Sequence, residues 1–251
     1  MEGRSILALL SDIHGNAEAL NACLKHAREN GARRYAFLGD LVGYGADAQA
    51  VVSTIMRYAR DGALVVKGNH DEAVEQGRSR YLNQAAREAI EWARQTLTRD
   101  EKEFLAQLPL WLREGNLCLV HAYAASPERW EYVDSTSAAL KSMKAAAATY
   151  TFSGHVHDQV LFAQVSSGKA ARYRPIPGSP VPVPTHRKWL GLVGSVGQPR
   201  DGNPAAAYAL FDDALARLTY FRIPYDHLGA AKKIRAAGLS EALAFRVQKG
   251  I

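Results

Sequence analysis

The sequence has few cysteines and no long hydrophobic run, and both absences restrict the class of protein. It contains two cysteines, Cys23 and Cys118, far apart in a chain of 251 residues. Such a pair is not the disulfide framework of a small secreted domain, so we expect two buried free thiols. No stretch has the roughly 18 apolar residues of a membrane-spanning helix. The apolar run at 6–10 lacks the features of a signal peptide, so we expect a soluble, cytoplasmic protein with no membrane partner.

The sequence also lacks a long run of basic residues, although its formal net charge is +6. Lys and Arg number 31 against 25 Asp and Glu, and they are scattered. This balance disfavours nucleic acid as a partner and is compatible with a phosphorylated small molecule. Hydrophobic residues make up 47% and charged residues 22%, which argues for a folded core rather than disorder. The sequence leaves the oligomeric state open.

Strand and helix patterns alternate along the first two-thirds of the chain. Short apolar runs bounded by polar turns predict buried strands. Between them, helical spacing of apolar residues predicts helices, including one over 82–97 and a shorter one capped by Thr98 and Glu101. This alternation favours a sheet with helices on its faces. The expected strands are 5–10, 35–38, 63–66, 116–120 and 150–152.

The pattern changes after His157, where the chain becomes richer in strands. The alternating segment 159–165 predicts a half-exposed strand, whereas the proline-rich segment 174–184 is incompatible with a central strand. No repeat, linker or sharp boundary divides the sequence, so we predict a single domain over 1–251. Further strands are expected at 189–193, 207–211 and 216–221, and short helices at 230–237 and 239–247.

Polar side chains with metal-binding chemistry follow the ends of five predicted strands. Because open α/β sheets bind ligands at the carboxyl ends of their strands, we expect these side chains to converge at one edge. Each motif alone could be an ordinary turn, since Asp, Asn and Gly are common there. Their recurrence after five strands argues for a site. The side chains are Asp12, His14, Asp40, Asn69, His70, Asp71, His121, His155 and His157.

This mixture of imidazole, carboxylate and amide groups suits transition metals such as Mn, Fe, Zn, Co or Ni. In an extended segment, Asp12 and His14 would point to the same side, as would His155 and His157. A carboxylate can also bridge two ions, and two ions about 3.5 to 4 Å apart can hold a phosphoryl group during in-line displacement. The residues therefore predict a metal site suited to phosphoryl chemistry.

Five motifs resemble the motif series of the calcineurin-like metallophosphoesterases. The resemblance spans residues 5 to about 224, and the segment 194–202 resembles the YfcE-like bacterial and archaeal branch. It implies an α/β fold, a four-layer αββα sandwich in which helices flank two mixed β-sheets. The motifs are Asp12-Ile13-His14-Gly15-Asn16, Gly39-Asp40-Leu41-Val42-Gly43-Tyr44-Gly45, Gly68-Asn69-His70-Asp71, Val120-His121-Ala122 and Gly154-His155-Val156-His157.

The same resemblance implies two metal ions, with manganese expected and iron, zinc, nickel or cobalt as alternatives. A hydroxide held between the ions would be the nucleophile. His70 matches the family's non-ligand histidine and would stabilise the transition state or protonate the leaving oxygen. The implied ligands are Asp12, His14, Asp40 and His157 for one ion and Asp40, Asn69, His121 and His155 for the other, with Asp40 bridging.

Departures from related families bear on the substrate. The serine/threonine phosphatases and diadenosine tetraphosphatases carry Gly-Asp-x-Val-Asp-Arg-Gly, whereas this chain has Gly43 and Tyr44 in place of the second Asp and the Arg. The carboxylate that orients the catalytic histidine and an arginine that binds phosphate are thus missing, which disfavours a protein phosphatase. Arg200 is a candidate replacement for that arginine. Tyr44, Trp130 and Tyr132 are candidate walls of the substrate pocket.

The leading prediction is an enzyme, a metal-dependent phosphoric ester hydrolase acting on a small-molecule phosphoester or nucleotide. A phosphodiesterase is favoured, and a phosphomonoesterase, a protein phosphatase-type enzyme and a dinucleoside polyphosphate hydrolase are the alternatives. A prediction from another class is a non-catalytic, metal-supported scaffold. Scaffold members of the superfamily typically lose ligands or the non-ligand histidine, whereas this chain keeps all seven ligands and His70.

Overall fold

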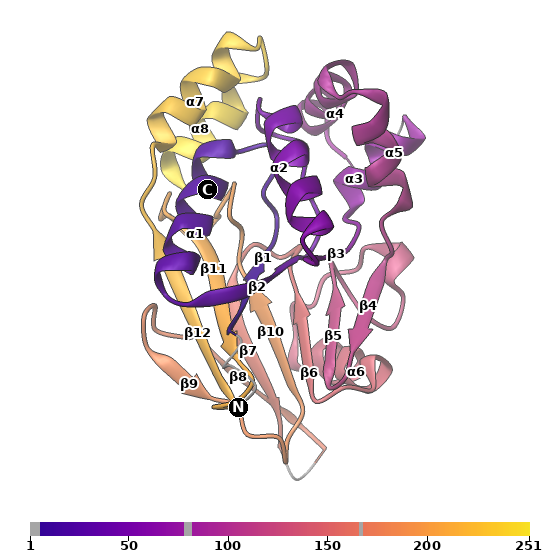
Figure 1. The fold of residues 1–251 in the computed structure, drawn as a ribbon, viewed down its shortest axis with the longest axis vertical. Helices are drawn as coiled ribbons and strands as arrows, with labels where there is room; N and C mark the ends of the chain where they lie inside the picture. Colours follow the sequence, from indigo (N-terminus) through magenta and orange to yellow (C-terminus); the bar gives the residue numbers. More distant parts are fainter. Residues whose placement is uncertain (1–5, 78–81, 166–167) are drawn as a thin grey trace.

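The structure is a computed structural model that describes residues 6–77, 82–165 and 168–251 (Figure 1). The strands of one sheet are β1 (Ile6–Leu10), β2 (Ala32–Phe37), β3 (Leu64–Val65), β9 (Pro180–Pro182), β11 (Ala206–Asp212) and β12 (Arg217–Ile223). Those of the other are β4 (Trp111–Glu114), β5 (Leu117–Val120), β6 (Tyr150–Ser153), β7 (Gln159–Gln164), β8 (Ala170–Tyr173) and β10 (Trp189–Val193). Their orders are β3-β2-β1-β11-β12-β9 and β4-β5-β6-β10-β7-β8. Both sheets mix parallel and antiparallel pairs, as β1 with β2 and β1 with β11 illustrate.

Helices cover the outer faces of the two sheets. They are α1 (Ala17–Glu29), α2 (Ala48–Arg60), α3 (Asn69–Gln76), α4 (Gln84–Thr96), α5 (Arg99–Gln107), α6 (Thr136–Ala146), α7 (His227–Ala236) and α8 (Glu241–Lys249), with a 3₁₀ turn at Pro127–Arg129. Within the described residues, α6 is the helix that packs on the second sheet, and the others share a core with the first sheet. The predicted four-layer αββα arrangement is therefore confirmed.

The alternation of side chains along the strands divides them between separate cores. In β1, Leu7 and Leu9 lie between the two sheets, whereas Ala8 and Leu10 pack against the helices. In β7, Leu161 faces the space between the sheets and Phe162 faces α6. The prediction of a half-exposed strand at 159–165 is wrong, because α6 packs on the face of β7 that was expected to be exposed to solvent.

Most predicted elements are present. The observed elements that were not predicted are short or have no clear apolar periodicity. The Thr98 capping box is confirmed, since the Glu101 side chain accepts a hydrogen bond from the Thr98 N–H at 2.8 Å. The proline-rich segment forms only the edge strand β9. Sequence reasoning did not predict α3, α6, β4 or β8. Ser5, the first residue of the predicted strand 5–10, lies outside the described residues.

None of the helices in the described ranges is long and apolar enough to cross a membrane. Both cysteines are buried and free, as predicted.

Candidate metal centre

The loops that follow β1, β2, β5 and β6 meet the first turn of α3 at one edge of the two sheets. This convergence is the one predicted from the strand ends. All seven predicted ligands are either buried or half-buried there, and six of them have less than a tenth of their surface exposed. The buried ligands are Asp12, His14, Asp40, His121, His155 and His157.

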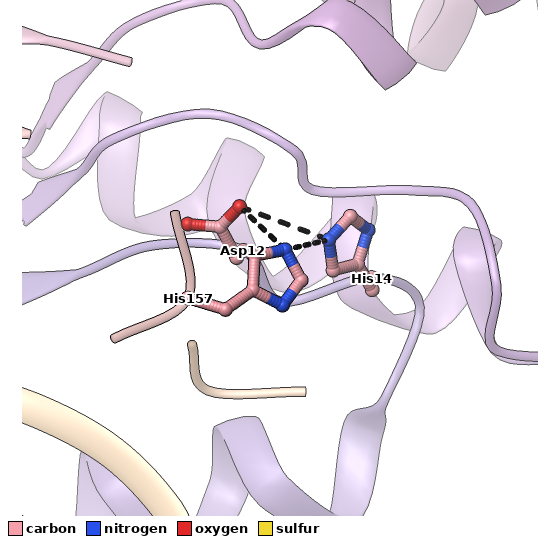
Figure 2. Close-up of side chains that lie close together, drawn as sticks. All are labelled: Asp12, His14 and His157. Atoms are coloured by element: carbon pink, nitrogen blue, oxygen red, sulfur yellow. Dashed lines mark hydrogen bonds and ion pairs between the residues drawn. The ribbon is translucent and has the colours of Figure 1, made fainter. Parts of the chain in front are cut away.

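Asp12, His14 and His157 form one compact group of ligand atoms (Figure 2). Nε2 of His157 lies 3.2 Å from Oδ1 of Asp12 and 3.2 Å from Nε2 of His14. Nε2 of His14 lies 3.7 Å from the same Asp12 oxygen. Because the three ligand atoms all lie within 4.8 Å of one another, a single cation could contact all of them.

Asp40 lies between this group and a second one. Its Oδ2 atom is 3.8 Å from Nε2 of His14 and 3.4 Å from Nε2 of His121. Nε2 of His121 is in turn 3.1 Å from Nδ1 of His155, so that Asp40, His121 and His155 form another compact group. The Asp40 carboxylate thus lies close to ligand atoms of both groups.

Four histidines are oriented by backbone carbonyl groups. Each carbonyl can accept a hydrogen bond from the ring nitrogen that faces away from the group, so that in the neutral imidazole the other nitrogen is unprotonated and can bind metal. The carbonyl oxygens are those of Val42 for His14 (3.2 Å), Leu38 for His121 (2.7 Å), Trp130 for His155 (2.8 Å) and Gln198 for His157 (2.6 Å). This pattern is typical of metal-binding histidines.

His70 differs from these four histidines. It is buried, but its Nδ1 atom has no hydrogen-bond partner, and its Nε2 atom lies 4.0 Å from Oδ2 of Asp40. Its backbone N–H donates to Oδ1 of Asp40 at 2.8 Å. The neighbouring Asn69 has a buried Oδ1 atom without a hydrogen-bond partner, which fits a metal-ligating amide. The Asn69 amide thus fits a metal ligand, and the His70 ring forms a further compact group with His14 and Asp40.

Burial and ion pairing together favour the ligand forms that bind metal. Burial lowers the pKa of His14, and it lowers the pKa of His155 to about 4, so both imidazoles are neutral at pH 7. Burial alone would raise the pKa of Asp12 and of Asp40, but the imidazoles of His157 and His121 outweigh it and hold both pKa values below the usual range. These carboxylates are therefore ionised.

His121 shows the opposite balance. Burial lowers its pKa, but the Asp40 carboxylate outweighs burial and raises the pKa to about 9. The excess of negative charge at Asp40 thus draws a cation to this position. A metal ion bound there would displace that proton.

Several ligands have a left-handed backbone conformation. Asp12, His14, Asp40, His155 and His157 have φ values between +50° and +69°. The Asp12–His14 and His155–His157 segments are therefore not extended, although Asp12 and His14 still belong to one group of ligands. His155 and His157 instead belong to different groups of ligands. Left-handed conformations of non-glycine residues are costly and cluster at functional sites.

Asp71 holds two of the ligand loops together, a role that sequence reasoning missed. Its Oδ1 atom accepts hydrogen bonds from the backbone N–H groups of Leu41 (2.9 Å) and Val42 (3.4 Å), and Oδ2 accepts from that of Gly68 (2.9 Å). Burial raises its pKa to about 7. An acidic residue three positions after Gly68 is a capping signal that could have predicted both α3 and this contact.

A pocket of about 440 Å³ opens above the ligands. The predicted wall residues Tyr44, Trp130 and Tyr132 line it, as does the predicted substrate contact Arg200. The Tyr44 ring lies 4.5 Å from the rings of both His14 and His70, and the Arg200 guanidinium carbon lies 5.9 Å from its centre. Arg246, on α8, also lines the pocket. No local sequence signal indicates it, because its position depends on how α8 packs.

Comparison with protein families decides the relationship that the motifs suggest. Residues 6–213 match the calcineurin-like phosphoesterase superfamily domain. The chain belongs to this superfamily. The buried carboxylates and imidazoles are therefore the candidate metal ligands of a superfamily member.

The chain is similar along its length to proteins of two other organisms. It is 33% identical to the uncharacterized protein MJ0912 of Methanocaldococcus jannaschii, covering 98% of this chain and 99% of that protein. It is 31% identical to the crystal structure of a metallophosphoesterase from Sphaerobacter thermophilus, with a TM-score of 0.88, covering 99% and 100% of the two chains. Similar structures also include the phosphoesterase YfcE of E. coli, 18% identical, with a TM-score of 0.41, covering 87% and 100%.

Proposed function

We propose that this calcineurin-like protein is a phosphoric ester hydrolase that uses two metal ions and acts on phosphodiesters. The observation that carries the proposal is the position of Oδ2 of Asp40 between His14 and His121, where it joins two groups of ligands. The first ion would be held by Asp12, His14, Asp40 and His157, and the second by Asp40, Asn69, His121 and His155. Such ions supply Lewis-acid activation of the phosphoryl group and lower the pKa of bound water.

His70 would act on the substrate rather than hold metal. Burial lowers its pKa, so that the imidazole is neutral at pH 7 and offers one N–H donor. Its backbone N–H is bound to Asp40, which fixes the imidazole beside the ligands, and the side chain lines the pocket. From there it would donate a hydrogen bond to a phosphoryl or leaving-group oxygen.

The preference for diesters rests on Gly43 and Tyr44. Among the described residues, the carboxylate recorded within 4.0 Å of the His70 ring is that of Asp40, an expected metal ligand, so no separate carboxylate replaces the orienting one of the protein phosphatases. A monoester dianion carries more charge than a diester monoanion and gains more from such a carboxylate and from an added arginine. Diesters therefore depend less on the missing groups.

A phosphomonoesterase is the second candidate, and one observation favours it. Arg200 lies over the Tyr44 ring and lines the pocket, so it could supply the missing guanidinium from another loop. A non-catalytic scaffold has less support, because the sequence keeps all seven expected ligands and His70.

The test is hydrolysis of matched aryl esters after metal removal and reloading. We expect Mn²⁺ to restore activity, with Fe, Zn, Ni and Co as further ions to compare, and kcat/KM to be higher for bis(4-nitrophenyl) phosphate than for 4-nitrophenyl phosphate. A tenfold preference for the monoester, about 1.4 kcal/mol of transition-state stabilisation, would favour the phosphomonoesterase. Absence of hydrolysis with every metal and ester would favour the scaffold.

A further inference from the structure

Three arginines line the same pocket. Arg129 is paired with Glu131 at 3.9 Å, and the other two come from distant parts of the chain. Arg200 lies in the loop after β10, and Arg246 lies near the end of α8. The N–H of Gly202 donates a hydrogen bond to the carbonyl of Gly250 at 2.7 Å, which ties the Arg200 loop to the end of α8. The two guanidinium groups are therefore delivered by segments that are fixed to each other.

The helix that carries Arg246 is also held in place. Arg235 on α7 donates hydrogen bonds to Oε2 of Glu241 at 2.7 Å and to Oε1 of Gln248 at 3.0 Å, both on α8. In Figure 1, the yellow helices α7 and α8 stand at the upper end of the molecule, across from α4. Arg246 thus lies on a helix whose position is fixed by hydrogen bonds to α7.

Neither arginine has a carboxylate partner in the part of the chain that the structure describes. Asp201, the acidic neighbour of Arg200, is bound by Arg222 at 2.6 and 3.0 Å. Arg200 donates one hydrogen bond to Oε1 of Gln198 at 3.2 Å, and its Nε atom is buried without a partner. Among the described residues that line the pocket, Asp40 is the acidic one, and it belongs to the metal centre. The outer pocket therefore has unneutralised positive charge.

Arg200 lies against the same aromatic ring, that of Tyr44, as His14 and His70. The Tyr44 ring is packed against His14 and His70, and Arg200 is stacked at 5.9 Å from the centre of that ring. A phosphoryl group beside Asp40 and His70 would be one aromatic ring away from Arg200. The guanidinium would then contact a more distant part of the substrate.

We propose that Arg200 and Arg246 form an anion subsite for a second phosphate, so that the preferred substrates are phosphodiesters with a further phosphate group. This inference rests on the proposed function, because it takes the metal centre as the place of hydrolysis. Paired guanidinium groups bind phosphate through charge-assisted, bidentate hydrogen bonds. A pocket of about 440 Å³ has room for such a substrate.

The test compares thymidine 5′-(4-nitrophenyl phosphate) with and without a 3′-phosphate, using the Mn-loaded protein. We expect the 3′-phosphate to raise kcat/KM about tenfold, which corresponds to one charge-assisted contact. R200Q and R246Q should each remove most of this advantage, so that the ratio of kcat/KM with and without the 3′-phosphate falls towards one. R246K, which keeps the charge but not the bidentate geometry, should retain part of the advantage. R187Q is the matched control, since Arg187 is exposed at the amino end of β10, away from the ligands.

Binding of two phosphomonoesters, with phosphate release measured alongside to exclude their turnover, keeps this test separate from diester hydrolysis. Calorimetry of the Mn-loaded protein should show that thymidine 3′,5′-bisphosphate binds about tenfold more tightly than thymidine 5′-monophosphate, with the same losses in R200Q and R246Q. If neither ester is hydrolysed but this difference is present, the proposed hydrolase function fails and the anion subsite stands. Equal kcat/KM values and equal affinities, or an advantage that both glutamine variants retain, would overturn the subsite.

Discussion

A Cβ atom on Gly43 would lie 2.2 Å from Nδ1 of His70. The imidazole therefore packs directly against the backbone of residue 43, in space that a side chain would occupy. Gly43 also has a φ of +87°, a conformation that favours glycine. The glycine that replaces the carboxylate of the protein phosphatases is thus also the residue that makes room for His70.

Substitution of Gly43 should reduce turnover through His70. We expect G43A to lower kcat at least tenfold while metal content is retained, because the new methyl group displaces the imidazole. G62A is the matched control, since Gly62 has a φ of +91° and a Cβ atom there would meet nothing within 4 Å. Both variants should lose about 1 to 2 kcal/mol of stability from the left-handed conformation. Equal kcat values for G43A and G62A would show that the contact with His70 is unimportant.

His70 and Asn69 should have separable roles. We expect H70A to lose about 100- to 10,000-fold in kcat on an ester with a poor leaving group, the usual contribution of one acid–base group, while metal content is unchanged. N69A should instead lower metal content, because its buried Oδ1 atom is the expected ligand. Elemental analysis measures the metal content of each variant, and steady-state kinetics measures its kcat. Loss of metal in H70A with full metal in N69A would exchange the two assignments.

Asp71 should contribute to stability and to the geometry of the ligand loops. In D71N, an amide group would face a backbone N–H donor in place of a carboxylate oxygen, since both Asp71 oxygens accept such bonds. We expect a loss of about 1 to 3 kcal/mol in the free energy of unfolding, measured by urea denaturation, together with weaker metal binding. Asp61 is exposed at the end of α2, so D61N is the control and should change little. Similar stabilities for the two variants would show that the Asp71 contacts contribute little.

The two thiols should be unreactive in the folded protein. Burial raises the pKa of Cys118 to about 11 and raises that of Cys23 still further, so neither forms a thiolate near pH 8. A chromogenic disulfide reagent should titrate no thiol in the native protein and both after denaturation. Rapid reaction of either cysteine without denaturant would contradict the burial of α1 or β5.

The residues of the candidate metal centre were easier to predict from the sequence than the backbone conformations and the helix layer around them. Asp12, Asp40 and His121 could be predicted together because each directly follows a buried strand, and the ends of such strands meet at one edge. The left-handed conformations of Asp12 and His155 could not be predicted, since the alternation of side chains along the sequence does not indicate them. The layer formed by α6 was missed because its buried positions are small residues such as Ala139 and Ala146, which give a weak apolar period.

Contacts between distant segments were the least accessible to sequence reasoning. Arg246 reaches the pocket only because α8 packs on α7 and its end is bound to the loop after Arg200. The role of Asp71 depends on the close approach of the β2 loop to the start of α3. Neither relationship leaves a periodic pattern in the sequence.

The metal content of wild type and of D40N tests the central proposal most directly. After reconstitution with Mn²⁺ and removal of free ions, we expect elemental analysis to give close to two ions per chain in the wild type. D40N should lose metal from both positions, whereas H157A and H155A should each affect mainly one. Asp40 would not be a shared ligand if the wild type held a single ion at full occupancy that H155A left unchanged, or if D40N retained both ions.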